Sequence, residues 1–316
     1  MFFHQIMRDF STKEILGITA ATSLGILAAA KLFTSSHNGT VIIPGRVRRL
    51  AEALFKNAGG GHPAGVAMHM PQVPSPELRE VGAPNGEERQ YMSKRLYMQL
   101  RVLDIDMKQI SKSFDDFVET VKKLFAKIPC VLYKDSSSSN SIGLLVWSED
   151  PSLFTDEVSR ALTHSSIAGK FSERPGWTMF GKTYSNGHEK DLNEYLFKKP
   201  IRTVMHDNWE WALWYPLRRR GPFYIQPPAD QCRMLLHHAA IGKAFSDVGA
   251  AHDVRLKCFG MDALDNEYVV GIIGDDLHGL SRVVEEMRKT RHTAEFLESL
   301  GPFFVGKKIW SNNPQE

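Results

Sequence analysis

Two adjacent histidines, His237 and His238, are the residues whose type and position most directly suggest chemistry. They lie in a segment, 228–245, with helical hydrophobic spacing, and only one of two neighbouring side chains on a helix can face the core. His238 is that one, because its neighbours at helical spacing are Met234, Leu235, Ile241, Gly242 and Phe245. A buried neutral imidazole has two interpretations here: a core histidine bonded to a backbone carbonyl, or an axial ligand to heme iron.

The elements that must position this helix occur twice in the same order. In the first half we expect strands at 95–103, 130–133, 142–147 and 178–184, and helices at 107–125 and 156–171. In the second half we expect strands at 209–215, 254–259, 268–273 and 303–310, and helices from 228 and from 275 to 297. Two β-α-β-β-α-β units predict an α+β fold with two ferredoxin-like halves, 89–200 and 201–316, packed sheet against sheet.

Several motifs of the second half resemble the chlorite dismutase family of heme proteins, which includes the coproheme decarboxylases. The family's proximal histidine pattern, H-x-x-x-G-[RK], matches His238 to Lys243, and its aromatic-Tyr-Pro motif matches Trp214 to Pro216. Leu264-Asp265 resembles the family's turn, and the segment 301–306, GPFFVG, resembles its C-terminal strand. The resemblance covers about residues 90–312. It implies a barrel of tandem ferredoxin-like halves, with His238 as the ligand of heme or coproheme iron and Tyr215 as the radical-forming residue.

The chain departs from the family at the distal side of the heme. The register of the family's distal Arg or Gln falls on Leu256, with Arg255 beside it. Because a strand alternates its faces, the two cannot both enter the pocket. Leu256 in the pocket would leave no polar distal group and predicts weak peroxide chemistry, whereas Arg255 in the pocket would supply one. The connection before this strand is also longer than the family's and contains His252.

Basic residues around the expected site allow two interpretations. One or two of them, with Lys199 and Arg218 as the candidates, would pair with heme propionates through charge-assisted hydrogen bonds. The group comprises Lys198, Lys199, Arg202, Arg218, Arg219 and Arg220. The alternative for most of this group is a solvated edge or a contact with acidic partners.

The N-terminal residues differ from the rest of the chain. Residues 15–33 form an apolar run whose one charge is Lys31, which predicts a single membrane-spanning anchor within 1–35. A secretory hydrophobic region or a buried core helix are the alternatives. Residues 36–88 are rich in Gly and Pro and predict an extended connector that neighbouring proteins hold. Basic residues after the run favour the body on the matrix or cytoplasmic side of the membrane.

Composition excludes some classes of function. The formal charge of +3 is nearly balanced, so nothing indicates nucleic acid binding. The 3 cysteines are scattered, which gives no metal spacing or disulfide framework and is typical of a reducing compartment.

Two functions remain open. In the first, the chain is an accessory subunit of a membrane complex, with a mitochondrial inner-membrane respiratory complex as the expected host and enzymatic activity lost; heme is then absent or inactive. In the second, it is a heme-dependent oxidoreductase similar to the peroxide-dependent coproheme decarboxylases. The N-terminal anchor and connector favour the first, and His238 with Tyr215 favours the second.

Overall fold

The computed structural model describes residues 74–110 and 113–314. The predicted anchor at 15–33 and most of the predicted connector lie outside these residues. Within them, no helix is both long enough and apolar enough to cross a membrane.

The described chain is an α+β structure built around one antiparallel sheet. Its main strands are β3 (Tyr97–Ile105), β4 (Cys130–Asp135), β5 (Ser141–Ser148), β7 (Met179–Lys182), β8 (Trp211–Arg219), β9 (His252–Lys257), β10 (Tyr268–Gly274) and β12 (Phe304–Asn312). From β10 the hydrogen-bonded order runs through β9, β7, β3, β5, β4, β12 and β8, and β8 pairs again with β10. The sheet therefore closes into a barrel, which leaves these strands no free edge at the closure.

Both halves of the chain contribute strands in the same order. The first half gives β7-β3-β5-β4 and the second gives β12-β8-β10-β9, so each half places its first strand between its third and fourth. The halves join along β4 and β12 on one side, and through the single register pair Lys182–Lys257 of β7 and β9 on the other. The short strands β6 (Phe171–Glu173) and β11 (Leu297–Leu300) extend β3 and β8.

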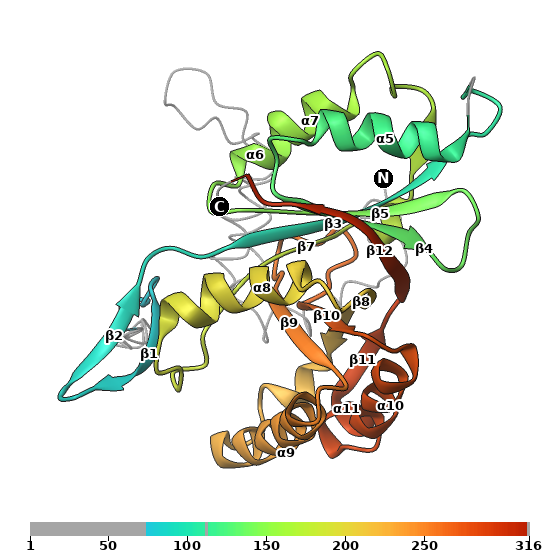
Figure 1. Cartoon of the computed structure of the whole chain (residues 1–316). Coiled ribbons are helices and arrows are strands. Elements are labelled where there is room, and N and C mark those ends of the chain that lie inside the picture. Colours follow the sequence, from blue (N-terminus) through green and yellow to red (C-terminus); the bar gives the residue numbers. More distant parts are fainter. Residues whose placement is uncertain (1–73, 111–112, 315–316) are drawn as a thin grey trace, which may run out of the picture. The chain divides into compact units, whose positions relative to one another are not determined.

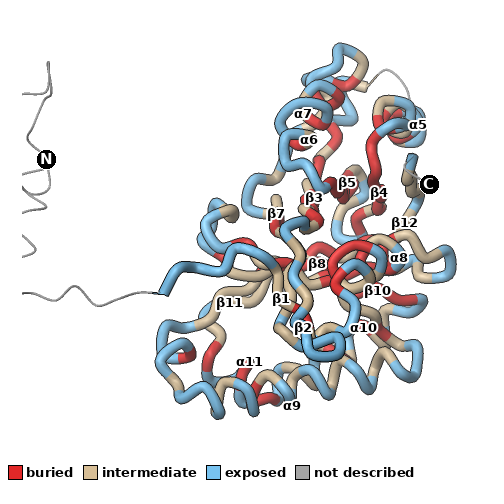
Figure 2. Tube along the Cα trace, turned by 90° about the vertical axis from the view of Figure 1, so that its left-hand side faces the viewer, coloured by how far each residue is buried: buried red, intermediate tan, exposed pale blue. Residues whose placement is uncertain are grey.

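Helices cover the outer faces of the barrel (Figure 1). Those of the first half are α5 (Phe114–Leu124), α6 (Ser152–Thr155) and α7 (Glu157–Leu162), and those of the second are α9 (Pro228–Asp247), α10 (Leu277–Arg288) and α11 (Arg291–Phe296). Between the halves, a π-helical turn, Glu194–Lys198, leads into α8 (Lys199–Met205). Figure 2 shows that burial concentrates on the strands, whereas α9 is mostly half-buried or exposed.

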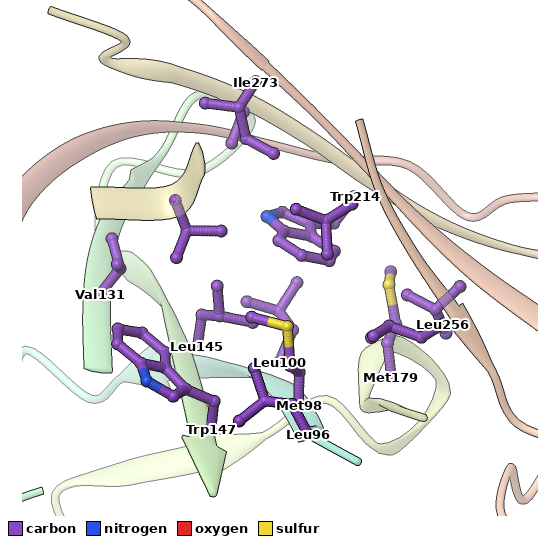
Figure 3. Close-up of a cluster of buried hydrophobic side chains, with 14 of the residues drawn as sticks. Leu96, Met98, Leu100, Val131, Leu145, Trp147, Met179, Trp214, Leu256 and Ile273 are labelled. Atoms are coloured by element: carbon purple, nitrogen blue, oxygen red, sulfur yellow. The ribbon is translucent and has the colours of Figure 1, made fainter. Parts of the chain in front are cut away.

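Alternation along the strands separates the barrel interior from its outer faces. Inward side chains form one dry core that includes Met98, Trp147, Trp214 and Leu256 (Figure 3). Outward side chains of the first half pack under α5–α7, and those of the second half, such as Leu213 and Tyr215, face α9 and α10. Each strand thus presents one set of side chains to the barrel core and the other to the helices.

Several expected elements differ in the structure. The helix expected at 107–125 begins at Phe114, and the helix expected at 156–171 ends at Leu162, because Phe171 already begins β6. The end of the predicted connector is an ordered hairpin of β1 (Glu80–Asn85) and β2 (Glu88–Met92), with a turn at Gly86 that has a positive φ of 69°. It is ordered because residues 185–189 hold it: the Ala83 N–H donates to the Glu189 carbonyl at 2.8 Å, and the Ser185 N–H donates to the Glu80 carboxylate at 2.9 Å.

The single helix expected at 275–297 is two helices. Thr290 ends the first and caps the second, since its hydroxyl accepts from the Thr293 N–H. A threonine in this capping position satisfies a backbone donor that a continuous helix would have paired internally. The break turns α11 toward α9, which matters for the site described below.

The close packing inside the barrel gives a first prediction. A Cβ added at Gly271 on β10 would lie 2.6 Å from the Trp214 ring. We therefore expect Gly271→Ala to lower the free energy of unfolding by about 1–3 kcal/mol, the usual cost of overpacking. Gly221→Ala is the matched control, because no atom lies within 4 Å of its added Cβ. Urea unfolding would measure both, and equal losses would contradict the tight contact.

Candidate functional site

Helix α9 carries the histidine pair and begins where the sequence predicts a start. Pro227 and Pro228 precede or open it, and Pro is well suited to the first turn because it lacks the N–H that would go unpaired there. Met234 is its one buried residue. The stripe that faces the sheet, including His238 and Gly242, is half-buried or borders the cavity below, whereas His237 is exposed.

A cavity of about 290 Å³ lies under this stripe, between α9, α10 and α11 and the outer face of β8–β10. Apolar side chains from the strands and from α10 line most of it, among them Leu217, Ile272, Val283 and Met287. Its polar lining includes His238, His292, Arg255, Asp253, Lys199 and Arg288. An apolar cavity with a few converging polar groups is typical of a site for a small molecule or cofactor.

His238 and His292 are neighbouring imidazoles in this cavity. Their ring centroids lie 5.2 Å apart in an edge-on arrangement, and the Nδ1 atom of each is buried without a hydrogen-bond partner among the described residues. Burial, followed by the positive charges of Arg219 and Arg255, lowers the pKa of His238 to about 4. Burial and Arg219 also lower the pKa of His292 to about 3. Both rings are therefore neutral near pH 7, the form that binds a metal.

The Nε2 atom of His292 is already occupied. Arg219 Nε donates to it at 2.9 Å, so this nitrogen cannot also bind a metal while that bond persists. Of the two rings, His238 is the one with no hydrogen bond in the described structure. The geometry thus makes His238, and not His292, the available ligand.

Strand β9 decides which residue faces the cavity on the sheet side. Leu256 is 1% exposed and belongs to the barrel core beside Met179, whereas Arg255 lines the cavity (Figure 3). Leu256 in the pocket, one of the two registers considered from the sequence, is therefore wrong. The cavity has a cationic, hydrogen-bonding side chain at this place, so the argument for weak peroxide chemistry from an apolar Leu256 no longer holds.

Arg255 belongs to a charged cluster at one end of the cavity. Its Nε lies 2.7 Å from the Asp253 carboxylate, Lys199 Nζ lies 3.0 Å from the other Asp253 oxygen, and Arg255 also donates to the Tyr195 hydroxyl. Burial would raise the pKa of Asp253, but Arg255 and Lys199 outweigh it and hold that pKa below its ordinary value. The Asp253 carboxylate therefore stays charged at neutral pH.

Two further residues singled out from the sequence also reach the cavity. Tyr215 lines it from β8, stacks on Phe303 with ring centroids 4.4 Å apart, and has a pKa raised by burial. His252 lines it beside Asp253, and its ring stacks on Trp209 at 3.6 Å. The structure thus brings His238, Tyr215, Arg255, Lys199 and His252 to one cavity.

Arg218 does not reach this cavity. It forms ion pairs with Asp265 at 3.0 Å and Glu298 at 2.9 Å instead. Its neighbour Arg219 points the other way and contacts His292. Arg219 belongs to the basic group considered from the sequence, and it lies beside the cavity, whereas Arg288, which lines the cavity from α10, was missed.

Comparison with known proteins identifies the wider group of this fold. The chlorite dismutase family model matches residues 108–309. A heme-binding protein from Thermus thermophilus superposes with a TM-score of 0.57 at 18% identity, over 69% of this chain and 92% of that one. A mutant chlorite dismutase from Candidatus Nitrospira defluvii superposes with a TM-score of 0.53 at 12% identity, over 68% and 92%. At these identities the two structures show a shared fold. A search of curated proteins finds no match.

The buried neutral histidines predict a pH dependence of stability. Because the pKa of His238 is about 4 in the folded chain and 6.5 ordinarily, the unfolded chain binds more protons between these values. Stability should be complete above pH 6.5 and fall as the pH drops toward 4, by up to about 3 kcal/mol from this residue.

Urea unfolding of the ligand-free protein at several pH values would test this. His238→Leu should reduce the loss of stability on acidification, since the leucine cannot be protonated. His237→Leu, on the exposed face of α9, should change the pH dependence much less than His238→Leu, and equal effects of the two substitutions would contradict the burial argument.

Proposed function

The chain belongs to the chlorite dismutase family, and on that premise we propose that its C-terminal half binds an iron tetrapyrrole, heme b or coproheme, through His238. The observation that carries this proposal is the buried, unpartnered ring nitrogen of His238 in an apolar cavity. An unpaired buried nitrogen is costly unless something else bonds the ring. A metal ligand in the cavity would give the imidazole that role.

The other side chains of the cavity fit the same kind of molecule. Its apolar walls suit a flat macrocycle, and Lys199 and Arg288 at its lining suit the macrocycle's carboxylates. The volume of about 290 Å³ is just below the range of roughly 300–1,000 Å³ for small-molecule sites, so α9 must move outward to admit a macrocycle. The single buried residue of α9 makes such a movement inexpensive.

We assign roles to the residues of this chain as follows. His238 would bind the iron, and Arg255, held by Asp253 and Tyr195, would place a hydrogen-bond donor in the same cavity. Iron tetrapyrrole, when bound, supplies a redox-active metal with a site for a small ligand. A heme-dependent oxidoreductase of the coproheme decarboxylase type is the more specific form of this proposal. It rests on Tyr215, whose phenol lines the cavity.

Heme uptake tests the proposal directly. We expect purified protein to take up heme or coproheme with a Soret band. His238→Ala should abolish the band, because the other cavity histidines are held by Arg219 and by the Trp209 ring, and His237→Ala should leave it largely intact. Tyr215→Phe should preserve binding and stop any peroxide-driven decarboxylation, since a phenyl ring cannot form a phenoxyl radical. A wild-type chain that binds neither tetrapyrrole would refute the proposal.

The sequence supports a second candidate function outside the described residues. We propose that residues 15–33 anchor the chain in a membrane, with the mitochondrial inner membrane and a matrix-facing body as the expected location, and that the chain is an accessory subunit of a complex there. The apolar run with the single charge of Lys31 favours this proposal.

Alkaline carbonate extraction separates anchored from peripheral protein. We expect the full chain to stay in the membrane pellet, and a chain that begins at residue 75 to be released, because it lacks the apolar run. Deletion of residues 36–74 alone is the matched control: it should keep the chain in the pellet but release it from any complex on native gels. Extraction of the full chain would exclude a membrane-spanning anchor.

A further inference from the structure

The side chains behind His238 form a chain of polar contacts in which no carboxylate touches either imidazole among the described residues. His292 is 3% exposed, and its ring packs edge-on against His238 at 5.2 Å. Arg219 Nε donates to His292 Nε2 at 2.9 Å. Because a guanidinium can only donate, His292 Nε2 must accept, and the neutral His292 ring then carries its proton on Nδ1.

Arg219 is itself fixed from several directions. Its NH1 group donates to the Tyr268 hydroxyl at 3.0 Å, and its backbone N–H donates to the Glu267 carboxylate at 3.2 Å. Its guanidinium also lies over the rings of Phe223 and Tyr268, at 4.6 Å and 4.5 Å. With these contacts the arginine holds the His292 ring in one orientation and one tautomer.

Few acidic side chains lie around the two imidazoles of His238 and His292. Asp253 is the one acidic residue that lines the cavity in the described part of the chain, and Lys199 and Arg255 already neutralise it. A histidine ligand that donates its second N–H to a carboxylate becomes a more basic, more electron-donating ligand. His238 has an imidazole beside it instead, and the charged group that contacts that imidazole is the Arg219 guanidinium.

We infer that Arg219 and His292 are positioning residues: they occupy the place behind His238 where a carboxylate would lie, leave His238 a weakly donating ligand, and thereby favour ferrous iron. The inference rests on the proposed tetrapyrrole function. Ferric iron carries one more positive charge than ferrous iron. A site with the Arg219 guanidinium and no carboxylate behind its histidine therefore disfavours ferric iron relative to a site that has a carboxylate there. The ligand class is then a tetrapyrrole whose ferrous form the Arg219–His292 pair stabilises.

Spectroelectrochemistry and resonance Raman spectroscopy of the full chain loaded with heme b test this tuning. His292→Glu should lower the midpoint potential and raise the ferrous iron–histidine stretching frequency, because Arg219 would hold the new carboxylate behind His238. His292→Gln, whose amide oxygen still accepts from Arg219, should stay close to wild type in both measurements. His237→Glu is the matched control: it adds the same charge one residue away on the exposed face, where water screens it, and should shift both values much less than His292→Glu. A midpoint potential in His292→Glu that equals or exceeds that of wild type would overturn the inference.

A measurement on the ligand-free chain keeps this test separate from that of the proposed function. In protein labelled with ¹⁵N-histidine, NMR spectra at neutral pH should show His292 with its proton on Nδ1, and Arg219→Leu should shift that population toward the other tautomer. A wild-type His292 protonated on Nε2 would overturn the positioning pair whether or not heme binds. The expected tautomer in a chain that takes up no heme would instead overturn the proposed function, and the tuning role with it.

Discussion

The alternation of side chains around a closed antiparallel barrel is the constraint on which the rest of this structure depends. Every strand of the ring has one face in a dry core, so a residue that points outward must meet either a helix or water. In the second half the outward residues of β8, β9 and β10 meet α9, α10 and α11, and the cavity lies where these elements leave space. Polar side chains such as Arg255 and Asp253 can lie there because their apolar neighbours on the same strand, Val254 and Leu256, fill the barrel core on the opposite face.

The same alternation of side chains explains why the charged residues of the site lie close together. A charged side chain on the outer face of β9 has few places to go once α8 and α9 cover the strand. Lys199 from the start of α8 and Arg255 from β9 therefore share one carboxylate, Asp253. Removal of one partner from such a group would leave the others uncompensated in a partly dry cavity. The guanidinium of Arg219 has no carboxylate partner in the described structure. It donates to the ring nitrogen of His292 and lies over aromatic rings such as that of Phe223.

How much of this could be predicted from sequence follows from the physics of each element. The repeated strand order and the position of His238 on the sheet-facing side of α9 depend on hydrophobic periodicity. This periodicity is clear over long segments of the sequence. The choice between Arg255 and Leu256 could not be made with the same certainty, because a shift of one residue exchanges the two faces of a strand. For the same reason Arg218 was expected at the site, where its neighbour Arg219 lies. His292 was missed because its segment reads as one continuous helix, and only the cap at Thr290 turns α11 toward α9. The threonine at position 290 is the one sequence signal that could have revealed the break.

The packing of α9 against the sheet bears on how the cavity would admit a tetrapyrrole. A helix of 20 residues with Met234 as its one buried residue gains little free energy from the contacts it makes with the sheet. Gly242 of α9 faces Met287 of α10, where an added Cβ would lie 3.4 Å from the Met287 methyl group, at ordinary contact distance. Apolar surface lost from this loose contact would be regained against a bound macrocycle, which offers a larger and flatter apolar face. The small volume of the cavity and the limited burial of α9 are therefore two aspects of one arrangement, in which the proposed tetrapyrrole would complete the packing of the second half.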